Sequence, residues 1–137
     1  MQDQEIADVL NQVKTIALVG ASDNPGRPSY GVMAYLLAQG YQVTPVSPKL
    51  AGQTLLGQPV YASLEDIPHP IDMVDVFRNS QAAYGVAQEA IAIGAKVLWL
   101  QIGVINEQAA VLARGAGVKV IMDRCPKIEI PRLGLER

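Results

Sequence analysis

Residues 16–32, IALVGASDNPGRPSYGV, contain the residue types of this chain that are best suited to holding an anion. An apolar run stops at Gly20, and helical apolar spacing returns only after Arg27 and two prolines. Gly20 permits a tight bend, and Ala21 and Ser22 are small enough for backbone N–H groups to approach an oxyanion. The stretch therefore predicts a phosphate-binding turn, or else a strand-to-helix turn without a ligand.

The spacing within this turn excludes two common phosphate-binding motifs. It lacks the G-x-G-x-x-G pattern of NAD-binding loops, to which Pro25 and Pro28 are foreign, and no G-K-[ST] of a P-loop follows. The turn alone therefore does not say which phosphate it would hold.

The end of the next predicted strand narrows the choice of ligand. In NAD-binding folds this place carries an acid for the ribose 2′-hydroxyl, whereas here it holds Ser47, Pro48 and Lys49. A lysine attracts a ribose phosphate that an acid would repel. Lys49 therefore favours NADP or coenzyme A over NAD, unless it is one of many solvated lysines.

Further polar and basic residues follow the remaining predicted strands. In a chain of net charge −2, three arginines and one lysine at strand ends form a local anion site. Each charge-assisted hydrogen bond to a phosphate contributes on the order of 1.5–3 kcal/mol. The other strand-end segments are Phe77-Arg78-Asn79, Gln101-Ile102-Gly103 and Asp123-Arg124-Cys125-Pro126.

The elements that must position these residues alternate between amphipathic and short apolar segments. The expected helices cover residues 6–13, 29–39, 80–94 and 107–116, with Ser29, Ser80 and Asn106 as caps. The expected strands cover residues 15–19, 41–46, 72–77, 97–100 and 118–122. Residues 50–70 are turn-rich, with a short strand near Val60 and a helical turn at 64–67. The tail from Lys127 is short and broken by proline, and covers a sheet edge or a partner.

This order predicts an α/β fold, because strands alternate with helices and four of the five strands are almost continuously apolar. The expected architecture is a Rossmann-like, doubly wound five-stranded parallel sheet with helices on both faces. We expect one domain over residues 1–137, since no repeat or linker divides the chain. Ligands of such sheets bind beyond the carboxyl ends of the strands, where all the segments above would meet.

Composition excludes several classes of protein. Eleven basic against thirteen acidic residues, with no basic block, argue against nucleic acid as the partner. No apolar run approaches the ~20 residues that cross a bilayer, and no secretory signal pattern is present. A single cysteine excludes an internal disulfide framework. We therefore expect a cytoplasmic protein with a small-molecule ligand.

The motifs at the five strand ends resemble a known family. VGAS with P-x-R-P-S-Y, PVSPK, MVDVFRN, WLQIGV and MDRCP resemble the small stand-alone bacterial CoA-binding domain proteins. These are similar to the N-terminal domain of the succinyl-CoA synthetase α subunit and of ADP-forming acyl-CoA synthetases. The resemblance runs from about residue 6 to residue 133, and it implies coenzyme A as the ligand.

The resemblance also implies a role for four of the strand ends. The segment after the first strand would meet the CoA phosphates, and the segment after the second strand would border the adenosine and its 3′-phosphate. The segment after the third strand would run along the adenine or pantetheine side, and the segment after the fourth strand would touch the nucleotide. The implied CoA-binding residues are Gly20, Ala21, Ser22, Arg27, Ser47, Pro48, Lys49, Phe77, Arg78, Gln101, Ile102 and Gly103.

The chain departs from the synthetases, which phosphorylate a histidine in a second domain. Its one histidine, His69, lies between two prolines in the turn-rich segment, which predicts a surface residue. The first hypothesis is therefore a CoA-binding protein without catalysis of its own. A small NADP-dependent oxidoreductase and the CoA-binding subunit of a split acyl-CoA ligase are the alternatives, and homodimerisation stays open.

Two further candidates have ordinary structural interpretations. Cys125 follows Arg124, whose charge favours a thiolate able to form a mixed disulfide with CoA, but a buried packing residue is the favoured interpretation. Asp72 and Asp75 are three apart on a strand and so point to opposite faces, which excludes paired acid–base work. No residues have metal-ligand spacing.

Overall fold

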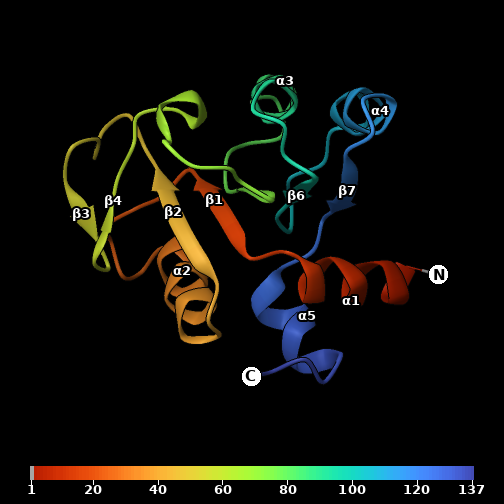
Figure 1. Ribbon diagram of the computed structural model, residues 1–137, viewed down its shortest axis with the longest axis horizontal. Coiled ribbons are helices and arrows are strands. Elements are labelled where there is room, and N and C mark those ends of the chain that lie inside the picture. Colours follow the sequence, from red (N-terminus) through yellow and green to blue (C-terminus); the bar gives the residue numbers. More distant parts are fainter. Residues whose placement is uncertain (1) are drawn as a thin grey trace.

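A computed structural model describes residues 2–137 and contains a five-stranded sheet between two layers of helices (Figure 1). The sheet order is β2-β1-β5-β6-β7, and every pairing is parallel. The strands are β1 (Thr15–Val19), β2 (Gln42–Val46), β5 (Met73–Val76), β6 (Val97–Leu100) and β7 (Lys119–Met122). The chain leaves β1 in one direction to form β2 and in the other to form β5, so the strand order reverses there. The predicted doubly wound Rossmann-like fold is confirmed.

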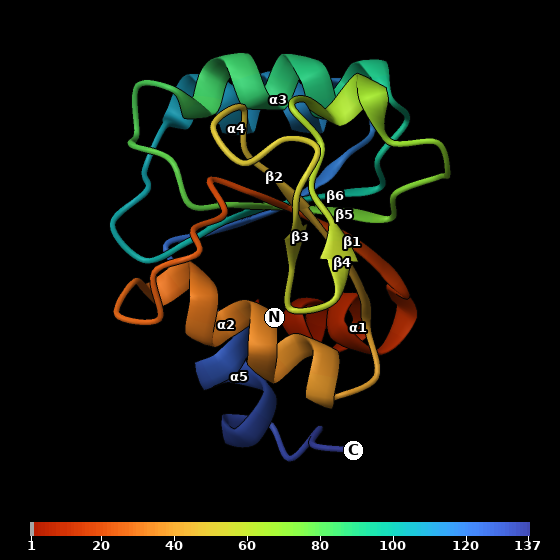
Figure 2. The same ribbon diagram turned by 90° about the vertical axis from the view of Figure 1, so that its left-hand side faces the viewer.

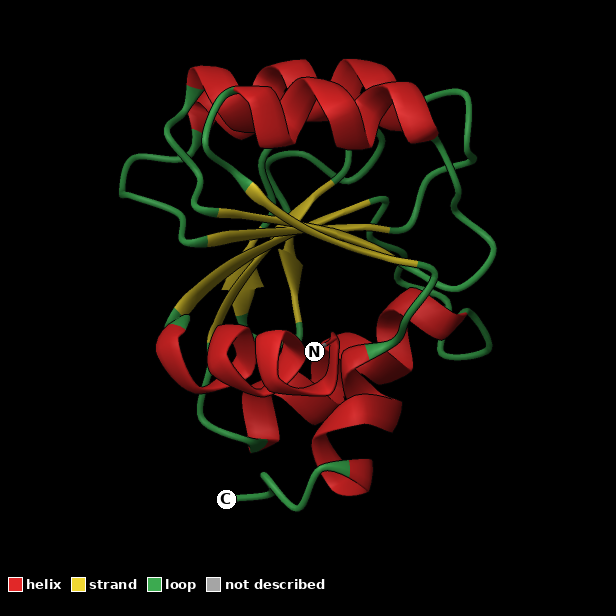
Figure 3. Cartoon of the chain, turned by 90° about the vertical axis from the view of Figure 1, so that its right-hand side faces the viewer, coloured by secondary structure: helices red, strands yellow, loops and turns green. Residues whose placement is uncertain are grey.

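Helices cover both faces of the sheet, as Figures 2 and 3 show from opposite sides. One layer holds α1 (Gln2–Gln12), α2 (Pro28–Ala38) and α5 (Pro126–Arg132), and the other holds α3 (Ala83–Ala92) and α4 (Glu107–Gly115). Alternate strand residues divide between the two cores. Leu98 packs on the α3/α4 side and Trp99 on the side of α1, α2 and α5. Within residues 2–137, no helix has the length and apolarity needed to span a membrane.

The turn-rich segment is more ordered than its sequence predicts. It forms a small antiparallel hairpin of β3 (Thr54–Leu55) and β4 (Gln58–Pro59), followed by a 3-10 turn, η1 (Leu64–Asp66). Tyr61 then pairs with Val46 at the end of β2, and the Ser47 N–H donates to the Tyr61 carbonyl at 2.9 Å. This pairing brings the residues before η1 to the carboxyl end of the sheet.

Two of the three predicted helix caps are wrong. α2 begins at Pro28, whose fixed φ suits the first helical position, with Arg27 as the N-cap and Ser29 buried in the first turn. α3 begins only at Ala83, and the Ser80 hydroxyl instead donates to the Gly103 carbonyl at 3.2 Å. The third cap is confirmed, because Asn106 Oδ1 accepts from the Ala109 N–H at 2.9 Å.

The proline-broken tail is in fact the helix α5, which packs on α1 and α2 rather than on a sheet edge. Ile130 is 1% exposed in that core. Arg132 forms ion pairs with Asp3 of α1 at 2.8 Å and with Glu129 at 2.7 Å. These contacts between distant parts of the chain outweigh Pro131, which the sequence analysis interpreted as a helix breaker.

Gly20 forms the bend between β1 and α2 at the point where the strand order reverses. Its φ is +91°, a conformation that L side chains rarely adopt. A Cβ atom there would lie 2.9 Å from the carbonyl oxygen of Phe77, which follows β5. Only glycine therefore lets the ends of these two neighbouring strands approach so closely.

We predict that Gly20→Ala lowers the free energy of unfolding by about 2–4 kcal/mol, because it adds a backbone contact to an unfavourable φ. Urea unfolding is the measurement. Gly40→Ala controls for φ alone, since its φ is +96° but an added Cβ meets nothing within 4 Å. Gly85→Ala, in α3 with the same open space, should be neutral or stabilising. Equal stability of Gly20→Ala and Gly40→Ala would show that the contact with Phe77 costs nothing.

Candidate functional site

Two cavities meet at Gly20 on the carboxyl edge of the sheet. The first, of about 350 Å³, lies between the end of β1 and the start of α2 and is called here the Arg27 cavity. The second, of about 480 Å³, lies between the ends of β1 and β2, η1 and α3 and is called the Lys49 cavity. Gly20 lines both. The strand reversal thus forms a crevice at the place where ligands of open α/β sheets bind.

The Arg27 cavity has the groups that an oxyanion requires. Five of its lining residues were predicted from the sequence, namely Gly20, Ala21, Ser22, Arg27 and Phe77, and Pro28 and Ser29 of α2 complete it. The N-terminal end of a helix carries partial positive charge and free N–H groups.

The backbone amides of this turn are not all available to a ligand. The N–H groups of Gly20 and Ala21 both donate to the Val46 carbonyl, at 3.1 and 3.2 Å, which differs from the expectation for Ala21. Within residues 2–137, no backbone carbonyl accepts from the amides of Ser22 and Ser29. An oxyanion in the Arg27 cavity would therefore meet these two amides and the Arg27 guanidinium.

The Lys49 cavity combines predicted residues with others that the sequence analysis missed. Ser47, Pro48, Lys49 and Arg78 line it as predicted from the strand ends. Ala62, Ser63, Leu64 and Glu89 also line it. The first three come from the segment after Tyr61, which only the pairing with β2 brings to this edge. Two cations and one acid thus border a cavity large enough for a nucleoside.

Gln101, Ile102 and Gly103 line neither cavity. Gln101 is 6% exposed and Ile102 is 58% exposed. The Gly103 N–H donates to Asp123 Oδ1 at 2.8 Å and its carbonyl accepts from Ser80, so the loop after β6 is held from two sides. A role for these three residues in CoA binding stays a prediction.

Asp72 and Asp75 do not form a pair of carboxylates at one site, as their spacing along the strand predicted. Asp72 lies at the amino edge and accepts from the N–H groups of Lys14 at 2.9 Å and Thr15 at 3.2 Å. Burial raises its pKa, but these hydrogen bonds and nearby Lys96 outweigh burial and hold the pKa below the ordinary value. Asp75 is fully buried in the middle of the sheet, and burial raises its pKa well above the ordinary value.

We predict that Asp75→Asn removes a pH dependence of stability. An unfolded Asp loses its proton near pH 4, whereas folded Asp75 keeps its proton to higher pH. Between these two pKa values the unfolded chain binds fewer protons. The free energy of unfolding therefore falls as pH rises, by at most about 1.4 kcal/mol per pH unit. Asn does not titrate, so the stability advantage of the variant should grow with pH.

Urea unfolding of both proteins between pH 4 and pH 8 measures this difference. Asp72→Asn is the matched control of opposite sign. The lowered pKa of Asp72 means that its carboxylate stabilises the fold above about pH 4, and this stabilisation is lost as pH falls. Parallel stability curves for wild type and Asp75→Asn would contradict the prediction.

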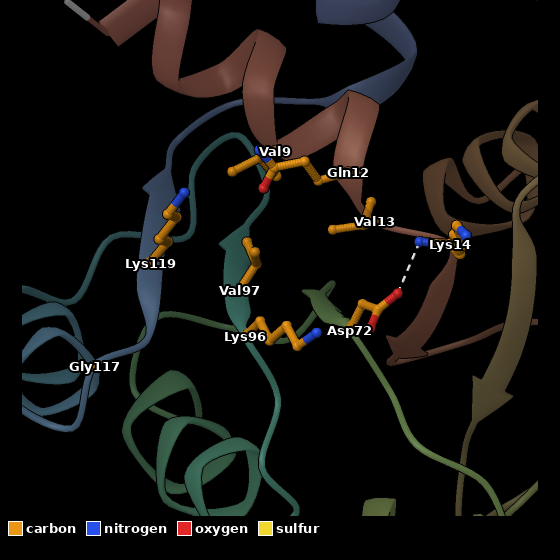
Figure 4. Close-up of a pocket in the computed structure, with 9 residues that line it drawn as sticks. All are labelled: Val9, Gln12, Val13, Lys14, Asp72, Lys96, Val97, Gly117 and Lys119. Atoms are coloured by element: carbon orange, nitrogen blue, oxygen red, sulfur yellow. Dashed lines mark hydrogen bonds between the residues drawn. The ribbon is translucent and has the colours of Figure 1, made fainter.

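A third cavity, of about 460 Å³, lies at the opposite, amino edge of the sheet (Figure 4). Lys14, Lys96, Lys119 and Asp72 border it, and Lys96 extends toward Asp72. The three lysines follow the C-terminal ends of α1, α3 and α4 along the chain. An acid of the protein, Asp72, already lies among these lysines, and the charge of Lys96 helps to lower its pKa, so the lysines do not by themselves indicate an anionic ligand.

Other candidate residues have structural explanations. His69 is half-buried beside Gln42 and Thr44 of the edge strand β2, and it lines neither carboxyl-edge cavity. Cys125 is 8% exposed within the core under α1, α2 and α5, so the favoured interpretation as a packing residue is confirmed. Across residues 2–137, no cluster of His, Cys, Asp or Glu is arranged to hold a metal ion.

A doubly wound sheet with a cationic crevice at its strand reversal is typical of nucleotide-binding Rossmann-like proteins. Comparison with known proteins is more specific, because residues 14–131 match the CoA binding domain family. The chain belongs to this family, and the resemblance predicted from its strand ends is confirmed.

Individual relatives agree with this membership. The uncharacterized protein YneT of Bacillus subtilis is 41% identical over 124 residues, which are 90% of each chain. The solved structure of cell-free ID.343 from Thermus thermophilus superposes with a TM-score of 0.92 at 41% identity, covering 97% of this chain and 99% of the other. The α subunit of the ADP-forming acetate–CoA ligase I of Pyrococcus furiosus is 30% identical over 95 residues. That match covers 66% of this chain and 21% of the relative.

Proposed function

We propose that this protein binds coenzyme A or an acyl-CoA along the carboxyl edge of its sheet and has no catalytic activity of its own. The observation that carries the proposal is the meeting of the Arg27 and Lys49 cavities at Gly20. One elongated ligand can occupy both. Its diphosphate would lie in the Arg27 cavity and its adenosine with the 3′-phosphate in the Lys49 cavity.

The distribution of charge supports this orientation of the ligand. Among the residues that line the Arg27 cavity, Arg27 is the one cation, and it lies at the N-terminus of α2. Lys49 and Arg78 lie together in the other cavity, where a second phosphate group would meet them. A nucleotide without a phosphate on its ribose would leave Glu89 as the one acid beside these two cations. This pattern favours CoA over NAD, and family membership favours it over NADP.

The proposed lack of catalysis is supported by the position of the one histidine. His69 lies on the outer edge of the sheet and not in the crevice, so it is not placed to exchange a phosphoryl group with a ligand there. No side chain that lines the two cavities is a histidine or a cysteine. Binding, rather than covalent chemistry, is what this crevice offers.

Lys49→Glu should selectively remove the preference for the 3′-phosphate. We predict that CoA stabilises the wild type by about 2.7 kcal/mol at 100 times its Kd, and that dephospho-CoA, NADP and NAD bind more weakly. In Lys49→Glu the affinity for CoA should fall to that for dephospho-CoA or below. Thermal unfolding with and without CoA measures the stabilisation, and isothermal calorimetry with the four ligands measures the affinities. Lys119→Glu, an equal change of charge at the amino edge, is the matched control and should leave the affinities unchanged.

Binding of NADP in preference to CoA would overturn the proposal in favour of an oxidoreductase. Absence of binding by all four ligands would leave Gly20 as a structural turn only.

Arg27→Ala should weaken CoA and dephospho-CoA alike, because both carry the diphosphate. The expected rise in Kd is about 10- to 100-fold, equivalent to one lost charge-assisted hydrogen bond. The contrast with Lys49→Glu, which spares dephospho-CoA, is measured in the same calorimetric series. A loss confined to CoA in Arg27→Ala would place Arg27 at the 3′-phosphate and reverse the proposed orientation.

One observation favours a second function, as the CoA-binding subunit of a split acyl-CoA ligase. The Pyrococcus furiosus relative is a ligase subunit in which the matched region forms about a fifth of the chain. Co-purification with a separate protein, together with acyl-CoA formation from CoA, a carboxylic acid and ATP, would favour this function over binding alone.

A further inference from the structure

Glu89 is the one acid among the residues that line the two carboxyl-edge cavities. It belongs to α3, it is exposed, and it lines the Lys49 cavity together with Lys49 and Arg78. Both ion pairs within residues 2–137 belong to Arg132, so Glu89 is paired with neither of these cations. The cavity therefore keeps opposite charges apart, which leaves each of them available to a ligand.

The two signs of charge lie at different ends of this cavity. Lys49 follows β2 and Arg78 follows β5, so both lie where strands end. Glu89 comes six residues after Ala83, the start of α3, and thus lies about 9 Å along the helix. Because α3 links two parallel strands, it runs back from the carboxyl edge toward the amino edge. The cavity therefore has a cationic end at the strand ends and an acidic end on α3.

The acidic end has a second acid beside it. Glu89 also lines a small adjoining cavity of about 170 Å³, whose other residues include Glu65 of η1 and no Lys, Arg or His. An anionic group of a ligand is unfavourable there, whereas a hydrogen-bond donor is favoured. This difference gives a bound nucleotide one orientation, with a phosphate toward Lys49 and Arg78.

An apolar wall adjoins the acidic end. Val86 of α3 and Leu64 of η1 line the Lys49 cavity and are 3% and 2% exposed. Val86 is three residues before Glu89, so the two side chains are neighbours on the surface of α3. A flat, apolar ring that packs on Val86 therefore has one edge at the Glu89 carboxylate. The purine base of a nucleotide has this shape.

The chemistry of a nucleoside 3′-phosphate determines which of its groups meets Glu89. An ionised carboxylate only accepts hydrogen bonds, so its partner must be a donor. Adenosine 3′-phosphate has donors at its ribose hydroxyl and at the 6-amino group of adenine. The hydroxyl is next to the phosphate, which the two cations hold at the other end of the cavity. The amino group is at the far edge of the base, away from the phosphate.

We propose that Glu89 selects the base of the ligand: its carboxylate accepts a hydrogen bond from the 6-amino group of adenine. This inference rests on the proposed function and adds a specificity to it. A purine without an amino group at this position leaves the carboxylate without its donor and binds more weakly.

Calorimetry with adenosine 3′,5′-bisphosphate and purine riboside 3′,5′-bisphosphate tests this specificity, because hydrogen replaces the 6-amino group in the second ligand. The wild type should bind the purine riboside about tenfold more weakly, as expected for one lost charge-assisted hydrogen bond. In Glu89→Leu the Kd for the adenosine ligand should rise about tenfold, and the difference between the two ligands should disappear. Glu89→Gln should keep a preference for adenosine, because its amide oxygen still accepts. A structural role would change both ligands equally.

Two variants control for charge. Glu65→Gln removes an equal charge from the adjoining cavity but does not touch the Lys49 cavity, so its Kd for each ligand should stay within about twofold of the wild type. Lys49→Glu should weaken both ligands by the same factor, since both carry the 3′-phosphate. Glu89 is exposed, so its substitution leaves the core unchanged.

Equal affinity of the wild type for the two ligands, or binding of CoA but of neither bisphosphate, would overturn the inference and leave the proposed function intact. A wild-type preference for adenosine in Glu89→Leu would also overturn it, because the acid would then not meet the amino group. Tighter binding of both ligands in Glu89→Leu would contradict it too, since the acid would only repel their phosphates. A wild type that binds neither the bisphosphates nor CoA would overturn the proposed function itself.

Discussion

The close approach of Gly20 to the backbone of Phe77 is the constraint on which the rest of this protein depends. The two residues follow adjacent parallel strands, and a side chain at Gly20 would meet the Phe77 carbonyl at 2.9 Å. The bend lets the chain turn from β1 into α2 while Val46, at the end of β2, accepts from the amides of Gly20 and Ala21. Three strand ends are thus joined at one point. Both carboxyl-edge cavities share that point.

Cations line cavities at both edges of the sheet, but in different surroundings. At the carboxyl edge, Arg27 stands at the N-terminus of α2, where a cation is unfavourable until an anion is shared between them. At the amino edge, the lysines share their cavity with the carboxylate of Asp72. Three cations line the amino-edge cavity and three line the two carboxyl-edge cavities, so the number of cations does not distinguish the two edges.

Membership of the CoA binding domain family and the geometry of the crevice concern different questions. The family match covers residues 14–131 and describes the class of ligand. The geometry concerns how this chain would hold such a ligand, with an arginine at a helix N-terminus and with a lysine and an arginine around a nucleoside-sized cavity. A fold alone does not specify function, so the proposals depend on these side chains rather than on the sheet.

The sequence by itself determined the order of strands and helices and most of the strand-end residues, because the spacing of apolar residues and the glycines that end helices and strands are local signals. Since all parallel strands end at the same edge, it also predicted that Gly20, Lys49 and Arg78 would lie close together. Only the tertiary structure decided that Ser63 and Glu89 join Lys49, that residues 126–132 form a helix, and that Asp75 meets Gln101. Each of these depends on contacts between segments remote in sequence, whose energies no local pattern records.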